Sequence, residues 1–258
     1  MLIERIGFAP LKGAHHIEHV AVELTAAGPV GDRAFCLVDP ERRRVLRTIE
    51  NRGLLQCVAR WRPPTLSVDL LGVTLEGVPA PTGVRLEVDY WGRAASVEVV
   101  DGPWSATFSA HLGRDVVLAK AIPGAVVYGA AVTLVTSSSA RLLAEKLGTR
   151  VDSTRFRSTF VINTDELEPH VEDTWTGRPL NLGTAQVQVR GPLPRCAVID
   201  LEPGTGRPDL EVLATLADYR RLNGEIRYGV DAVVTRPATV QTGDQVSVGK
   251  RPATLRNG

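Results

Sequence analysis

The sequence predicts a mostly β, α+β protein made of two β-barrel-like domains with a few short helices. Apolar or alternating segments of strand length recur along the chain, and glycines and prolines interrupt them at short intervals. That spacing is typical of barrels and sandwiches. Apolar residues make up 43% of the 258 residues, which is enough for one large or two modest packed domains.

Several segments are predicted strands because they are apolar, or alternate, between turn residues. They are 97–100, 130–135, 160–162, 185–189, 231–234 and 245–248. The segment 122–124 reads Ile-Pro-Gly and separates two β-rich halves of similar length. We therefore expect an N-terminal barrel-like domain over 1–121 and a second domain over 122–258.

Three segments are predicted helices. Residues 137–147 carry apolar side chains on one face, with Ser137 as N-cap and Gly148 as the terminating residue. A second helix over 210–219 follows a Pro-Asp pair, which is a good start signal. A third, over 104–112, follows a proline and ends at a glycine.

Composition excludes several classes of partner. The formal net charge is +1, so no bulk field attracts nucleic acid or an anionic membrane, and we expect neither partner. No apolar run is long enough to span a bilayer and no leader pattern is present, which predicts a cytoplasmic protein. The three cysteines predict a reducing compartment without a disulfide framework. Cys36 and Cys57 lie in strand-like apolar surroundings and are expected in the core.

Common catalytic motifs are missing from the sequence. It contains no Gly-x-Ser-x-Gly elbow, no Gly-x-Gly-x-x-Gly or Walker loop and no His-Glu-x-x-His. His15, His16 and His19 cluster in a polar stretch that lacks partner ligands. We expect a solvated loop or strand end there in preference to a metal site.

Cys196 is the candidate reactive residue. It lies between a predicted strand and an acidic turn, directly after Arg195 and close to two prolines. A rigid, electropositive setting stabilises a thiolate, which is both a nucleophile and a soft-metal ligand. The alternative is a buried cysteine that acts as a small apolar residue, which is the commoner case.

Cations and hydroxyls are scattered at the ends of other apolar segments. Arg155 and Arg157 enter an apolar strand, where each needs a carboxylate or a phosphate as partner. Lys12 and Arg47 each end an apolar segment, and Ser137 is either an ordinary cap or part of an anion site. Together with Cys196 they predict a pocket for an anionic, phosphorylated cofactor whose reactive centre binds sulfur.

Particular motifs carry a resemblance to a known family. They are Arg-Phe-Arg-Ser-Thr-Phe-Val-Ile at 155–162, Arg195-Cys196, Glu-Pro-x-Thr-Gly at 202–206, Leu-x-x-Tyr-Arg at 216–220, Gly229, Gly-Asp-x-Val at 243–246, Pro-Leu-Lys at 10–12 and Gly-Asp-Arg-Ala-Phe at 31–35. In this order and spacing they resemble proteins with the molybdenum cofactor sulfurase C-terminal (MOSC) domain, preceded by its β-barrel companion domain. Among these the chain is most similar to the group that includes the amidoxime-reducing component.

The resemblance implies a molybdenum cofactor (Mo-molybdopterin) and roles for particular residues. Cys196 would ligate the metal, and the cofactor contacts would come from Lys12, Ser137, Arg157 and either Arg47 or Thr48. Thr159 stands where relatives often have asparagine, and it keeps a hydrogen-bonding group there. Arg195 would tune the thiolate or pair with an acid such as Asp200.

Three other features that match the family, or lie near its motifs, are interpreted as structural. Gly-Asp-Arg at 31–33 is expected to be architecture at a barrel rim in preference to a cofactor contact. Trp175 and Tyr219 are expected to pack in the interior rather than contact a substrate. By domain analogy, pyridoxal phosphate remains open as a second cofactor.

The resemblance also implies an activity. We expect a molybdenum-dependent oxidoreductase that reduces N-hydroxylated small molecules, or N- or S-oxides, by oxygen-atom transfer. Its electrons would come from a separate protein: a reductase, a haem protein or an iron–sulfur protein. Two alternatives stay open, namely a sulfur carrier or transferase that holds a persulfide on Cys196, and a non-catalytic carrier of the cofactor.

Overall fold

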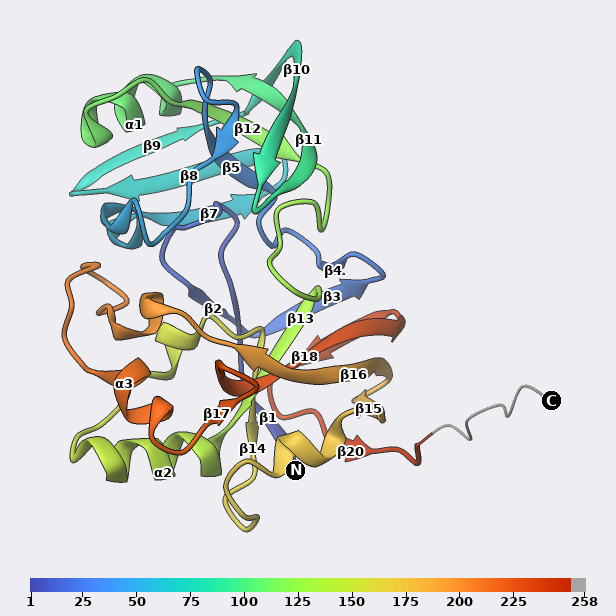
Figure 1. Cartoon of the computed structure of the whole chain (residues 1–258). Helices are drawn as coiled ribbons and strands as arrows, with labels where there is room; N and C mark the ends of the chain where they lie inside the picture. Colours follow the sequence, from blue (N-terminus) through green and yellow to red (C-terminus); the bar gives the residue numbers. More distant parts are fainter. Residues whose placement is uncertain (252–258) are drawn as a thin grey trace.

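The computed structural model describes residues 1–251 and confirms a mostly β fold with few, short helices (Figure 1). Two units lie one above the other in that view. The upper unit contains a closed barrel with strand order β10-β11-β12-β5-β6. Its strands are β5 (Phe35–Asp39), β6 (Arg44–Val45), β10 (Ala80–Tyr90), β11 (Arg93–Asp101) and β12 (Val117–Ala121).

A three-stranded meander and one helix complete the upper unit. The meander runs β7 (Val58–Arg62), β8 (Thr65–Leu70) and β9 (Val73–Gly77). Helix α1 (Trp104–Leu112) buries Trp104 and Phe108 at an interval of four, and it ends at Gly113 with φ 65°. A 3₁₀ turn, η1 (Arg52–Gln56), buries two leucines beneath the barrel.

The lower unit is built on a nine-stranded sheet with main order β2-β1-β14-β13-β18-β16-β15-β20. Its strands are β1 (Leu2–Phe8), β2 (Ile17–His19), β13 (Val132–Thr136), β14 (Phe160–Asn163), β15 (Pro179–Leu182), β16 (Ala185–Pro194), β17 (Arg221–Leu222), β18 (Glu225–Arg236) and β20 (Val246–Val248). A second sheet joins β19 (Ala238–Gln241), β3 (Ala21–Thr25) and β4 (Gly28–Pro29).

The strands within the first 29 residues pair with the lower unit, although Leu11 between them bridges to Phe35 of β5. Strand β1 is antiparallel to β14, and β3 is antiparallel to β19. The chain then builds the upper unit over residues 35–121 before it returns to the sheet at β13. The boundary at residue 121 stays a prediction, and strand pairing adds that the N-terminal segment is shared with the C-terminal sheet.

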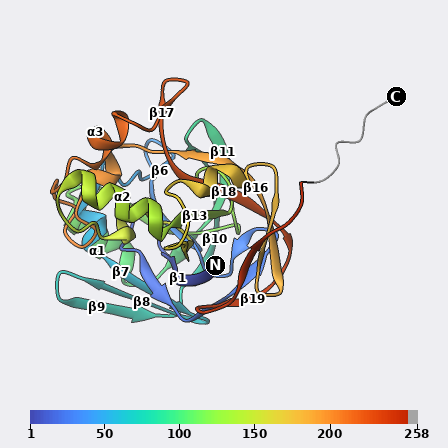
Figure 2. The same cartoon turned by 90° about the horizontal axis from the view of Figure 1, so that it is seen from below.

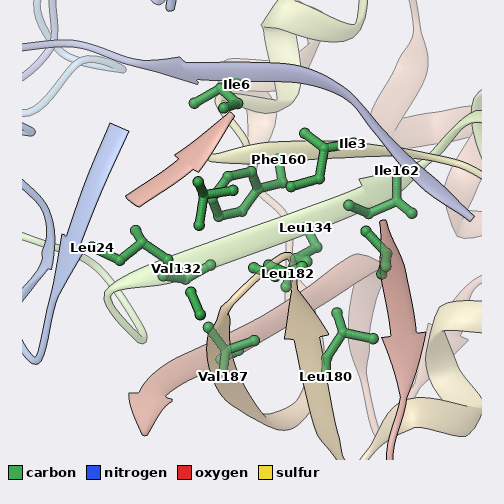
Figure 3. Close-up of a cluster of buried hydrophobic side chains, with 14 of the residues drawn as sticks. Ile3, Ile6, Leu24, Val132, Leu134, Phe160, Ile162, Leu180, Leu182 and Val187 are labelled. Carbon is green, nitrogen blue, oxygen red and sulfur yellow. The ribbon is translucent and has the colours of Figure 1, made fainter. Parts of the chain in front are cut away.

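The main core of the lower unit is made by strands from both ends of the chain (Figure 3). Ile3 and Ile6 of β1 contact a cluster that includes Leu134, Phe160 and Leu182, each at most 1% exposed. Burial of each such side chain contributes about 1.5–3 kcal/mol. This packing fixes β1 against the sheet, and therefore fixes the point at which the chain leaves for the barrel.

Two helices cover a second core in the lower unit, and Figure 2 shows them on the same side. Helix α2 (Ser137–Leu147) and the short α3 (Val212–Ala217) pack through Leu143 and Leu216. Three further 3₁₀ turns are η2 (Ser153–Phe156), η3 (Val171–Trp175) and η4 (Ala197–Asp200).

The predicted elements can be compared with these bounds. Both 104–112 and 137–147 are helices with the predicted ends, although Thr136 rather than Ser137 is the N-cap of α2. The predicted helix over 210–219 is only α3, because residues 210 and 211 precede the helix and residues 218 and 219 form a turn after it. Each predicted strand lies within or overlaps an observed one. Trp175 is 2% exposed in the main core and Tyr219 packs on the helix-covered core, so both packing predictions are confirmed.

Candidate functional site

A cavity of about 270 Å³ lies between the two units and is lined by residues of both. Its polar lining is dominated by cations: Lys12, Arg33, Arg47, Arg155, Arg157 and Arg195. Among the described residues that line it, none is a carboxylate. A cavity with this charge attracts an anion.

Three of the six cations have carboxylate neighbours. Arg155, with its side chain only 2% exposed, donates to both carboxylate oxygens of Asp209 at 3.1 and 2.9 Å. Arg33 forms an ion pair with the buried Asp32. Arg47 lies 3.5 Å from Glu50 and 3.7 Å from Asp89. In the part of the chain that the structure describes, Lys12, Arg157 and Arg195 have no ion pair with a carboxylate.

Arg157 is held in the cavity by its backbone and by one carbonyl. It ends η2 in the left-handed region, with φ 53°, and its Nη1 donates to the carbonyl of Ala14 at 2.8 Å. Burial, with Arg33 adding repulsion, lowers the pKa of Arg157 to about 10. The guanidinium therefore stays charged at neutral pH, without a counter-charge of its own.

Arg195 is fixed by two backbone carbonyls. Its Nε donates to Tyr228 and its Nη1 to Phe156, both at 2.8 Å, while Nη2 is buried without a partner. Burial lowers the pKa of Arg195 to about 10. The expected pairing with Asp200 is wrong, because that carboxylate instead accepts the backbone N–H of Leu213.

Lys12 is the cation of the cavity that is nearest to losing its proton. Burial is the main cause, and repulsion by Arg33 and Arg157 adds to it, so the pKa of Lys12 falls to about 7. Its Nζ lies 5.6 Å from the ring centroid of Tyr90, whose buried hydroxyl has no partner. Burial raises the pKa of Tyr90 to about 12.

Cys196 opens onto this cation cluster. The residue is exposed, follows β16 and precedes η4, so the alternative of a buried, apolar cysteine is wrong. Cys36 and Cys57 are buried, as predicted, and burial raises the pKa of each to about 12. Among the described residues no group of three or more His, Cys, Asp or Glu side chains could hold a metal ion. Cys196 is thus a single soft ligand beside an anion-binding surface.

The structure brings together most, but not all, of the residues that were predicted for the site. Lys12, Arg47, Thr48, Arg157, Arg195 and Cys196 all line the cavity. Ser137 does not: its hydroxyl donates to Asp165 and accepts from the Thr164 N–H. Thr159 is buried behind the wall and exchanges hydrogen bonds with Thr133, which does line the cavity.

Sequence reasoning missed other lining residues. The Gly-Asp-Arg segment at 31–33 was expected to be architectural. Asp32 is buried and does not line the cavity, but Arg33 does. The aromatic side chains of Tyr90, Trp91 and Tyr128 also line it. One signal in the sequence could have indicated this role for Trp91. It precedes a glycine in a two-residue hairpin turn, where a small polar residue is expected.

His16 departs from the expected solvated setting. It is 3% exposed, lines a small cavity of about 10 Å³ together with Arg155 and Arg157, and its Nδ1 has no partner. Burial, reinforced by Arg157 and Arg5, lowers the pKa of His16 well below its usual value. Its ring is therefore neutral and lies behind the cation cluster. The ring of His19, at the end of β2, stacks on that of Phe8, with 3.7 Å between the ring centroids.

Comparison with known proteins identifies the domain to which the cavity's C-terminal wall belongs. A family model described as the MOSC domain matches residues 109–247, which is more than half of the chain. Curated relatives include a "Molybdenum cofactor sulfurase" of Oryza sativa subsp. japonica, 39% identical over 82 residues, and another of Solanum lycopersicum, 37% identical over 78 residues. These alignments cover 31% and 30% of this chain but only 10% and 9% of the relatives.

Two solved structures match the chain over part or most of its length. The YUAD protein from Bacillus subtilis matches 96% of this chain and 94% of its own, at 14% identity and a TM-score of 0.47. YiiM from Geobacillus stearothermophilus matches 48% of this chain and 56% of its own, at 17% identity and a TM-score of 0.36. At these scores neither structure supports a functional inference. Within residues 1–251, the helices are too short or too polar for any of them to cross a bilayer.

Proposed function

The chain belongs to the MOSC domain family, and on that premise we propose that it binds the molybdenum cofactor in the cleft between its two units and reduces N-hydroxylated small molecules, or N- or S-oxides, there. One observation carries the proposal. A cavity whose described lining has six cations and no carboxylate also contains an exposed cysteine. An anion-bearing ligand with a soft metal centre suits that combination.

The residues present fit such a group. The phosphate and the pterin need donors, and Lys12, Arg157 and Arg195 supply positive charge that the described carboxylates do not neutralise. Arg195 Nη2 and Arg47 Nε are buried atoms without hydrogen-bond partners in the part of the chain that the structure describes. A buried donor without a partner costs about 1–3 kcal/mol, and a ligand oxygen at these atoms would remove that cost.

Cys196 would supply one sulfur ligand to the metal. Its neighbours restrict its position, because Arg195 is anchored to the carbonyls of Tyr228 and Phe156 and η4 begins directly after it. When bound, the cofactor would provide two-electron redox chemistry at a site open to substrate. Serine is a poor ligand for a soft metal, so the thiolate is the group on which the proposal depends.

The reaction needs protons as well as electrons. Conversion of an amidoxime to an amidine breaks the N–O bond, consumes two electrons and two protons, and releases one water. Lys12 Nζ, with its pKa lowered to about 7, can hold or release a proton in the cleft at neutral pH. Cys36 and Cys57 are buried in hydrophobic cores and do not line the cavity, so we propose that the electrons come from a separate protein: a reductase, a haem protein or an iron–sulfur protein.

We place this activity in the cytoplasm, with a small-molecule substrate. The test is elemental and pterin analysis of protein expressed in a host that makes molybdopterin, followed by turnover of an amidoxime with a dithionite-reduced viologen dye. We expect near-stoichiometric molybdenum and amidine formation. Cys196→Ser should keep the fold and lose at least tenfold in activity. Full activity in that variant would remove Cys196 from the role of ligand.

The two plant relatives are both named molybdenum cofactor sulfurase, which favours a second candidate function, a sulfur carrier or transferase. An exposed thiol beside Arg195 is also a suitable persulfide site. Mass spectrometry of the purified protein separates the two: a persulfide on Cys196 without molybdenum supports sulfur transfer. Molybdenum with pterin but without turnover would indicate a cofactor carrier.

A further inference from the structure

The turn between β10 and β11 has a backbone that does not suit its first residue. Trp91 and Gly92 have φ values of 57° and 76°, so both central residues of this two-residue hairpin lie in the left-handed region. Such turns favour Asn-Gly, because a bulky residue in that region costs about 1–2 kcal/mol. The indole is also 43% exposed. The fold therefore gains little from tryptophan at this position.

Two other hairpins show what the same backbone accepts. The β17–β18 turn uses Asn223-Gly224, with φ values of 50° and 80°, which is the favoured pair. The β8–β9 turn uses Leu71-Gly72, with φ values of 51° and 83°, and Leu71 is 65% exposed. Leu71 thus shares the conformation and the exposure of Trp91, but it does not line the cavity.

A second exposed aromatic side chain meets Trp91 from the connection between β12 and β13. Tyr128 is 53% exposed, and its ring centroid lies 5.6 Å from that of Trp91 at an interplanar angle of 60°. Arg93 Nη2 donates to the carbonyl of Val127 at 2.7 Å, which ties the turn to the segment that carries Tyr128. The guanidinium of Arg47 lies 4.1 Å from the Trp91 ring centroid. The two rings therefore meet at the cavity with a fixed cation on one side.

We propose that Trp91 and Tyr128 form an aromatic subsite that binds the flat, uncharged ring of a substrate while its N–O group faces Cys196. The identity of that reacting group rests on the proposed function. Aromatic rings pair edge-to-face or offset, which the contact between Trp91 and Tyr128 already demonstrates. A cationic ring is disfavoured, because Arg47 contacts the tryptophan and no carboxylate lines the described cavity.

Exposure distinguishes this subsite from the region that would hold the cofactor. Trp91 and Tyr128 are 43% and 53% exposed, whereas Tyr90, next to Lys12, is 1% exposed. Lys12, Arg157 and Arg195 are half-buried, so the cations without an ion pair are less exposed than the two rings. An anionic cofactor is attracted inward, which leaves the outer aromatic pair to a neutral ligand that enters from solvent.

The experiment compares N-hydroxybenzamidine with N-hydroxyacetamidine, which share a reacting group and differ in the ring. Calorimetric binding to the oxidised protein, without reductant, gives an affinity ratio that does not depend on turnover. We expect the wild type to prefer the aromatic ligand by about tenfold or more. Trp91→Asn and Tyr128→Ala should each reduce that ratio several-fold, and Tyr128→Phe should retain it.

Leu71→Asn is the matched control, because it places asparagine at the same left-handed position of an exposed hairpin turn that does not line the cavity. It should leave the affinity ratio unchanged. Trp91→Asn should keep the wild-type melting temperature or raise it, since asparagine suits the turn. A large fall in melting temperature would make Trp91 a structural residue and overturn the subsite.

Two further results would overturn the proposal. One is an unchanged affinity ratio in both Trp91→Asn and Tyr128→Ala. The other is loss of molybdenum and pterin from these variants, which would assign the rings to the cofactor. If the wild-type protein contains no molybdenum, the proposed function fails, but the calorimetric ratio still decides the subsite.

Discussion

Arg155 and Arg157 are separated by one residue, yet their surroundings differ in kind. Arg155 is paired with both carboxylate oxygens of Asp209 and also donates to the carbonyl of Ile199 at 2.9 Å. Arg157 has one backbone carbonyl and two cationic neighbours, Arg33 and Lys12, and the Asp32 carboxylate attracts it without forming an ion pair with it. We conclude that a buried charge in an ion pair supports the fold, whereas one without an ion pair is available to a ligand.

The largest effect is expected when the paired arginine, Arg155, is removed. Arg155→Met should lower the free energy of unfolding by about 3 kcal/mol, because Asp209 and the Ile199 carbonyl lose their donors. Urea denaturation of the cofactor-free protein measures the change. Asp209→Asn, which keeps a hydrogen-bonding group, should cost less. Wild-type stability in Arg155→Met would show that the ion pair is not structural.

The second test removes the arginine that lacks a counter-charge. Arg157→Met should leave the stability of the cofactor-free protein unchanged or raise it, because repulsion with Arg33 and Lys12 is relieved. Its affinity for sulfate, a stand-in for phosphate, should fall about tenfold, equivalent to ~1.4 kcal/mol. Isothermal titration calorimetry reads the affinity, and Arg157→Lys should lose less. Undiminished sulfate binding would contradict a ligand role.

The smallest expected effect concerns pH. Lys12 has its pKa lowered to about 7, so sulfate, whose charge is constant in this range, should bind several-fold more weakly at pH 8.5 than at pH 6. Lys12→Met should bind sulfate weakly at both values. In the ligand-free protein, stability changes with pH in the opposite direction. The unfolded chain keeps the Lys12 proton up to about pH 10.5, whereas the folded protein releases it near pH 7. The free energy of unfolding therefore rises between pH 7 and about 10.5. A flat sulfate profile in the wild type would exclude Lys12.

Local features of the fold could be predicted from the sequence. The ends of α1 and the burial of Cys36 and Cys57 follow from spacing, glycine caps and apolar context. Long-range pairings could not be predicted this way. Asp209 rather than a phosphate partners Arg155, and carbonyls rather than Asp200 hold Arg195, because either partner satisfies the same donors and only the tertiary fold selects between them.

Where prediction of the candidate site differs from the structure, the physical reasons are similar. Ser137 has the right residue type at a helix start, but Asp165 across the loop takes its hydroxyl. His16 lies in a polar segment, yet the crossing from β1 to the barrel buries it behind Arg157. Arg33 shares a turn with a buried acid and still reaches the cavity. In each case a contact between distant segments outweighs the local pattern.

The strand β1 has a consequence for how this protein can be divided. Because β1 and β3 are built into the C-terminal sheets, while Leu11 and Ala14 between them pack in the core of the upper unit, the barrel is joined to the rest by several chain crossings rather than by one linker. A fragment that begins at residue 122 would leave the edge of β14 bare, which invites aggregation. A fusion of 1–29 to 122–251 through a short linker would restore that edge. The fusion would keep Cys196 but lack Arg47 and the β10–β11 turn with Trp91, so it would present only the C-terminal wall of the cavity.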